Sequence, residues 1–261
     1  MISGLDSATL KIVRAEEHLD AINRLIDAAT SRADSYEIIK DANGKEIVNF
    51  LVAPPPEVAI LTGEIVYHLR SAMDHLAFDL VKLNPSGSPL PVNWEEKCCF
   101  PLRRKVPKNT AYNFFGDDLP GISMSAFTFI ESMQPYHSGE GPHNVIKIIA
   151  QLSNADKHRH LNAVLSRVAV RQDFKSARGL QSTTIVGGFT HGAEVQSAIF
   201  TRGGQDPTVD MKRTFLPYLT FEELAIGAGP ASLEAQSILE LCVEQVKRVI
   251  LPAFINLLKK P

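Results

Sequence analysis

The sequence lacks several features that mark particular classes of protein. It has only three cysteines, two of them adjacent as Cys98 and Cys99, and these form neither a disulfide framework nor a metal-binding spacing. No window approaches about 18 uncharged apolar residues, and the N-terminus has no long apolar core. We therefore expect neither a membrane span nor a secretion signal, and we expect a cytoplasmic location.

An excess of charge of one sign is also lacking. Lysine and arginine total 27 against 29 aspartates and glutamates, which gives a net charge of -2. No field of the whole molecule would therefore attract nucleic acid or an anionic membrane. Any contact with RNA or another anionic ligand has to be local. The 261 residues are 44% hydrophobic, which is enough for a substantial core.

Helical periodicity dominates what the sequence does contain. Apolar residues at helical spacing predict helices within 6–33, 56–83, 121–165 and 230–259. The range 121–165 holds two helices, with Pro142 suited to the first turn of the second, and Pro252 should kink the last helix.

Strand patterns occur in two places. Two β-rich runs around Asn43 and Gly44 predict a hairpin over 35–53, and alternating runs between glycine-rich turns predict a four-strand meander over 166–221. Residues 84–120 form a long loop with one short β-like run, KCCFPL. We expect a single α+β domain over 1–261, mainly α. It would be an antiparallel bundle of about five helices with a small antiparallel sheet from the hairpin and the meander.

The stretch LRSAMDHLAFDL, residues 69–80, places ionisable groups in a helix that otherwise looks buried. On a helical projection Arg70 and Asp74 share one flank of the apolar face. The opposite flank carries a polar stripe made of Glu64, His68, Ser71, His75 and Asp79.

A second stretch, QLSNADKHRHLNAVL at 151–165, also places ionisable residues in a predicted helix with an apolar face. Its projection turns Asp156 and His160 inward, with Arg159 at the edge of the core face. A charge buried without a partner is costly, so we expect the two helices to pack together. They would share one polar cluster of Arg70, Asp74, His75, Asp156, Arg159 and His160.

Two interpretations of this cluster stay open. It is either a structural ion-pair network that fixes the register of a helical bundle or a site of acid and base chemistry with displaced pKa values. A third possibility is a metal-dependent enzyme, with a site built from Glu64, His68 and His75 and completed by His158 or His160. We expect no cofactor.

The two helices also carry resemblances to known families. Together with CCFPL they resemble a family of uncharacterised bacterial proteins with L-R-x-A-x-D-H-L-A and L-x-N-x-D-K-H-R helices, over roughly residues 57–165. Arg70 and His75 are spaced as in the R-x4-H motif of HEPN ribonucleases, which implies metal-free RNA cleavage by a homodimer. There Arg70 would stabilise phosphate charge and His75 would transfer protons. Ser71 departs from the family's usual residue after the arginine.

Positive charge gathers locally in the long loop. Arg103, Arg104 and Lys105 lie among aromatic residues, a mixture that suits an anionic ligand as well as a solvated loop. Lys157 and His158 point away from the core face of their helix and could join such a site.

Overall fold

The computed structural model describes most of the helical residues and part of the strands. The described residues are 3–31, 35–40, 42–44, 46–103, 105, 118–137, 142–158, 163–176, 179–185, 210–221 and 235–259. The chain divides into two compact units. Unit 1 comprises Met1–Ala21, Ile60–His160 and Ile238–Pro261, and unit 2 comprises Ile22–Ala59 and Leu161–Ser237. The single domain over 1–261 stays a prediction.

The described part of the chain is mostly helical, as predicted. Its helices are α1 (Gly4–Thr30), α2 (Pro56–Leu83), α3 (Trp94–Lys97), α4 (Met124–Ser132), α5 (Pro142–His158), α6 (Ala235–Gln245) and α7 (Leu251–Lys259). Of these, α2 has the predicted bounds, because Pro56 suits the first turn and the apolar spacing holds up to Leu83. The short helix α3 lies within residues 84–120, where the sequence predicted a long loop with one short β-like run and no helix.

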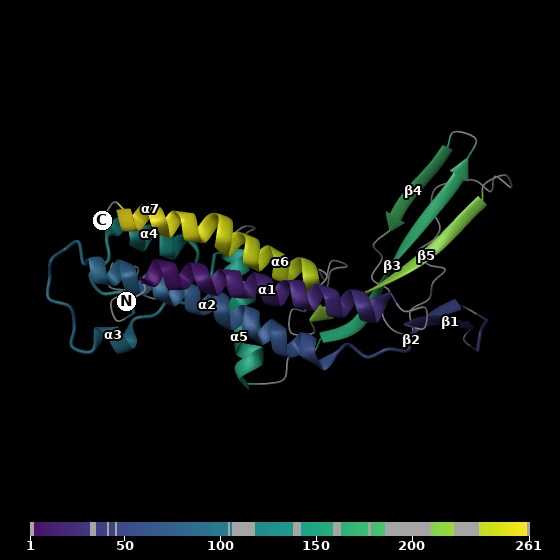
Figure 1. The fold of residues 1–261 in the computed structure, drawn as a ribbon, viewed down its shortest axis with the longest axis horizontal. Coiled ribbons are helices and arrows are strands. Elements are labelled where there is room, and N and C mark those ends of the chain that lie inside the picture. The colour runs from purple at the N-terminus through teal and green to yellow at the C-terminus, as the bar shows by residue number, and fades with distance from the viewer. Residues whose placement is uncertain are drawn as a thin grey trace. The chain divides into compact units, whose positions relative to one another are not determined.

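Within unit 1, α1 and α2 lie side by side in opposite directions (Figure 1). The backbone N–H of Leu5, at the start of α1, donates to Asp79 near the end of α2 at 2.9 Å. Further along, the His18 ring stacks on His68, with ring centroids 5.5 Å apart. Buried aliphatic side chains of both helices, such as Ile12, Ile65 and Leu69, belong to the core.

The helix α5 is shorter than the sequence predicts. It ends at His158, and the strand β3 begins at Ala163, whereas the helical pattern was expected to continue to 165. The expectation failed because the apolar residues at 161–165 fit both the spacing of a helix and the alternation of a strand over so short a run. The β-like run KCCFPL is not a strand either: Lys97 ends α3, and residues 98–103 belong to neither a helix nor a strand.

The last helical segment contains a π-helical turn, η4 (Val246–Ile250), between α6 and α7. The N–H of Leu251 donates to the carbonyl of Val246, which is the i to i-5 bond of a π-helix. Pro252 follows directly, and it has no N–H and would crowd the preceding turn of an α-helix. The wider turn gives this proline a place in a continuous helix.

The strands of unit 2 form two hydrogen-bonded groups. The strands β1 (Tyr36–Lys40) and β2 (Glu46–Phe50) pair antiparallel around Gly44, whose φ of 78° suits glycine. The strand β3 (Ala163–Ser176) lies between β4 (Gly179–Ile185) and β5 (Asp210–Phe221), antiparallel to both. Among the described strands the hairpin does not join the sheet of β3, contrary to expectation. The third of the four predicted meander strands, near 194–202, lies outside the described residues.

Candidate functional site

Asp74 fastens the segment after α3 to α2. Its Oδ1 accepts a hydrogen bond of 2.8 Å from the backbone N–H of Phe100, whose side chain is buried. Burial raises the pKa of Asp74, and the Phe100 hydrogen bond and the charge of Arg70 oppose this rise. The carboxylate therefore has a structural partner at its oxygen and a cation close by.

Arg70 and His75 have different surroundings, although both are half-buried. The charge of Arg70 acts on Asp74 and on Cys99, beside the segment that follows α3. Burial, followed by the nearby charge of Lys11 in α1, lowers the pKa of His75. The two side chains leave the helix about 140° apart. An R-x4-H site acting on one target would require Arg70 to reach around α2.

The expectation that Asp156 faces the core was wrong, because this side chain is exposed. Its carboxylate lies against the backbone of Gly63 in α2, at a distance that a Cβ on residue 63 would not allow. Gly63 is buried but has no side chain with which to cover the carboxylate. The helical projection gave the correct facing helix and the wrong exposure, since α5 ends only two residues later.

The remaining members of the predicted cluster are only partly described. Arg159, His160, Arg104 and the side chain of His158 lie outside the described residues. Lys157 is exposed, and its charge opposes the rise that burial causes in the pKa of Asp74. The helices α2 and α5 thus bring Asp74 and Lys157 within electrostatic reach.

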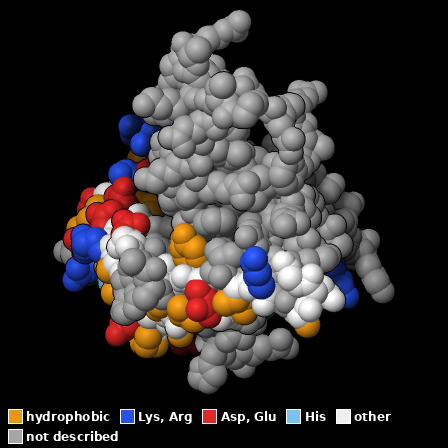
Figure 2. Space-filling view, turned by 90° about the vertical axis from the view of Figure 1, so that its right-hand side faces the viewer, with side chains coloured by type: hydrophobic (Ala, Val, Ile, Leu, Met, Phe, Trp, Pro, Cys, Tyr) orange, Lys and Arg blue, Asp and Glu red, His pale blue; other side chains and the backbone are white. Residues whose placement is uncertain are grey.

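Arg103 participates in the packing of the loop. Its side chain pairs with Asp118, and its backbone N–H donates to Oε1 of the buried Gln134 at 2.9 Å. Lys105, the other described cation of the predicted anion site, is exposed. Figure 2 shows one face of the molecule, where the described acidic and basic side chains are interspersed with apolar ones. On that part of the surface the charges are not separated by sign.

The seam between α1 and α2 holds a group of residues that helix-by-helix projection missed. Lys11 Nζ lies 5.6 Å from the centre of the Tyr67 ring, and Tyr67 is 62% exposed. The imidazole of His68 stacks on His18, and its buried Nδ1 has no hydrogen-bond partner among the described residues. Burial, then His18 and Lys11, lower the pKa of His68. Only the antiparallel pairing of the helices brings these side chains together.

Asp79, at the end of the same stripe, has a structural partner. Its Oδ2 accepts from the N–H of Leu5 in the first turn of α1. The carboxylate approaches Gly4 so closely that a Cβ there would lie 2.5 Å from it. Asp79 therefore caps the N-terminus of α1 from a neighbouring helix. Its negative charge also interacts favourably with the positive end of the α1 dipole.

The cysteines and the candidate metal ligands form no reactive centre in the described residues. Burial raises the pKa of Cys98 to about 12 and that of Cys242 to about 12, so these thiols stay protonated at neutral pH. In the described part of the chain no group of three His, Cys, Asp or Glu side chains is arranged to hold a metal ion. Glu64, His68 and His75 alone do not form such a set, and the side chains of His158 and His160, one of which would complete the suggested site, lie outside the described residues.

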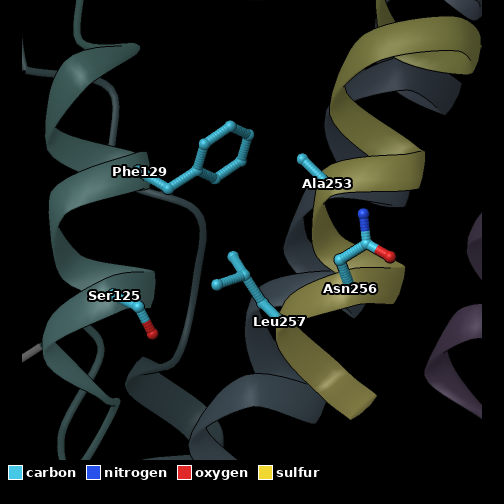
Figure 3. A pocket seen from close by; sticks show the side chains of 5 residues that line it. All are labelled: Ser125, Phe129, Ala253, Asn256 and Leu257. Atoms are coloured by element: carbon cyan, nitrogen blue, oxygen red, sulfur yellow. The ribbon is translucent and has the colours of Figure 1, made fainter. Parts of the chain in front are cut away.

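A shallow pocket of about 350 Å³ lies between α4 and α7 in unit 1 (Figure 3). Phe129 of α4 projects toward Ala253 and Leu257 of α7, while Ser125 and Asn256 add polar groups. Below this surface Phe129 meets the buried Phe254 edge-on, with ring centroids 5.8 Å apart. The pocket is lined mostly by apolar side chains and is separate from the charged residues of α2.

None of the described helices is both long and apolar enough to cross a lipid bilayer. Comparison of the chain with protein-family models, with curated proteins and with solved structures gives no match.

Proposed function

We propose that this chain is a non-enzymatic helical interaction or ligand-binding protein, in which Arg70 and Asp74 belong to a structural network. The hydrogen bond from Phe100 to Asp74 carries this proposal. A carboxylate that accepts a backbone N–H and lies beside a cation stabilises the attachment of a loop to a helix. The different neighbours of Arg70 and His75 support the same conclusion.

HEPN-like RNA cleavage or RNA binding by a homodimer is the second candidate. The state of His75 favours it, since a lowered pKa leaves more of the imidazole neutral and able to accept a proton at neutral pH. Arg70 keeps partial exposure and could meet a phosphate. In that candidate the catalytic set is Arg70 and His75, with Asp74, Arg159 and His160 orienting them. Asp156 is left out because it lies against Gly63, about two turns from Arg70.

An RNA cleavage assay separates the two candidates. The purified chain is incubated with labelled single-stranded RNA and a metal chelator, beside His75→Ala and, as a matched control, His137→Ala. If the protein is non-enzymatic, the wild type, His75→Ala and His137→Ala all give the same background level of RNA cleavage. Cleavage by the wild type that is lost in His75→Ala alone, with an unchanged circular dichroism spectrum, would establish the second candidate.

We also infer an antiparallel bundle of about five helices from the sequence pattern. The opposite directions of α1 and α2 support this arrangement. The pairing of β3 with β4 and β5 supports three strands of the proposed meander. A cytoplasmic location and membership of the bacterial family with the L-R-x-A-x-D-H-L-A helix belong to the same proposal.

A further inference from the structure

The α1–α2 seam, defined here by Lys11, Tyr67, Ser71 and His75, combines a cation with an exposed aromatic ring. Lys11 Nζ lies 5.6 Å from the Tyr67 ring centre, which is a cation–π contact. Tyr67 is 62% exposed although the Lys11 ammonium lies over its ring, so another flat group can reach this side chain. A large aromatic side chain that is exposed in this way is a stacking platform.

Several carboxylates of α1 and α2 already have other partners. Glu64 lies 3.5 Å from His18 Nε2, Asp79 accepts from the N–H of Leu5, and Glu17 pairs with Arg14. Within the described part of the chain no carboxylate forms an ion pair with Lys11. The ammonium instead lies among a phenol ring and imidazoles, and its charge reaches His68 and His75. A cation with this setting can accept an anionic partner without breaking an ion pair.

The spacing on α2 adds hydrogen-bonding groups to the same seam. Tyr67, Ser71 and His75 are four residues apart in succession, so they line one side of the helix along two turns. Ser71 and His75 are half-buried. Lys11 faces this line from α1, as its contact with Tyr67 and its effect on His75 require. The seam thus offers an ammonium, a hydroxyl and an imidazole next to an aromatic ring.

We propose that the α1–α2 seam binds a nucleotide, with the phosphate at Lys11 and Ser71 and the base stacked on Tyr67. A phosphate needs a cation and hydrogen-bond donors, and a base needs a flat apolar surface beside it. This inference rests on the proposed ligand-binding function and names its ligand. The nucleotide could be a free mononucleotide or a residue of single-stranded RNA, because both present the same phosphate and base.

The test measures binding by the full-length chain with NMR titration or calorimetry. The probes are adenosine monophosphate, adenosine, ribose 5-phosphate and a short single-stranded adenine oligoribonucleotide. We expect adenosine monophosphate to bind more tightly than adenosine or ribose 5-phosphate, because adenosine lacks the phosphate and ribose 5-phosphate lacks the base. If the oligoribonucleotide binds and the mononucleotide does not, the bound nucleotide belongs to single-stranded RNA, provided that the variants below weaken binding of the oligoribonucleotide.

Variants on both helices locate the site. Lys11→Gln and Tyr67→Leu should each weaken binding at least about fivefold, while Tyr67→Phe keeps the stacking ring and should bind nearly as the wild type does. Lys82→Gln, an exposed lysine in the last turn of α2, is the matched control for loss of charge. Circular dichroism of each variant verifies that the helices are intact.

Three outcomes overturn the proposal. One is no binding of any probe at millimolar concentration, and another is equal binding by the wild type, Lys11→Gln and Tyr67→Leu. The third is a concentration-dependent dimer that Tyr67→Leu abolishes without nucleotide binding, which would make the seam a protein interface. None of these affects the structural network of Asp74, which is tested by unfolding measurements and by the RNA cleavage assay.

Discussion

At the scale of single residues, Asp74 can be separated into its hydrogen bond and its charge. Asp74→Ala leaves the N–H of Phe100 without an acceptor, and we expect a loss of about 1–3 kcal/mol in the free energy of unfolding. Asp74→Asn keeps an oxygen acceptor and removes a charge that burial disfavours, so it should cost less than about 1 kcal/mol. Urea unfolding at neutral pH measures both variants. Equal losses would show that the charge beside Arg70, and not the hydrogen bond, is the important part.

The second residue-scale prediction concerns His68. Its pKa in the folded chain is lowered from 6.5, chiefly by burial, so the unfolded chain binds more protons as the pH falls below that value. The contribution of His68 is therefore most favourable above about pH 6.5 and is lost as the pH falls. We expect His68→Gln to flatten the decline in unfolding free energy below pH 6.5, measured by urea unfolding. His137→Gln, outside the seam, is the control. A decline as steep in His68→Gln as in the wild type would contradict the prediction.

At the scale of elements, the contact between α2 and α5 depends on Gly63. Alanine favours a helix by up to about 1 kcal/mol over glycine, but here its Cβ would overlap the carboxylate of Asp156. We expect Gly63→Ala to stabilise the chain in an Asp156→Ala background and to be neutral or destabilising in the wild type. Thermal unfolding of the four proteins of this cycle measures the coupling. Additive effects would mean that Asp156 moves away without cost.

The same two helices show what sequence patterns can predict. The bounds of α2 follow from a proline, a long apolar period and a polar end, all of which are local. The exposure of Asp156 depends on a neighbour that lacks a side chain, and no projection of α5 alone contains that information. The cap that Asp79 supplies to α1 is likewise a contact across 74 positions of the chain. Periodicity finds elements, whereas the partners of their polar residues depend on how the elements pair.

At the scale of the whole molecule, the near-neutral charge limits how a nucleotide can be bound. With a net charge of -2, no general attraction adds to the contact at Lys11. We expect the logarithm of the binding constant for the single-stranded oligoribonucleotide to fall with the logarithm of salt concentration with a slope of about -0.7, as for one phosphate contact. Calorimetric titrations at several salt concentrations measure this slope. A slope several times steeper would indicate a broad basic surface instead of the seam.

The π-helical turn η4 also sets the phase of the helix that follows it. The buried residues Cys242, Val246, Ile250 and Phe254 recur every fourth position, and in an ideal α-helix each step would rotate the side chain by about 40°. The wider turn absorbs that rotation, so Phe254 still faces the interior. If Val246–Ile250 kept all five residues but formed a regular α-helix, all of α7 would be rotated by about 100°, whereas deleting one of these residues would restore a regular helix and leave α7 facing as it does now. The aromatic contact with Phe129 and the pocket beside it therefore depend on the wide turn that accommodates one additional residue in η4.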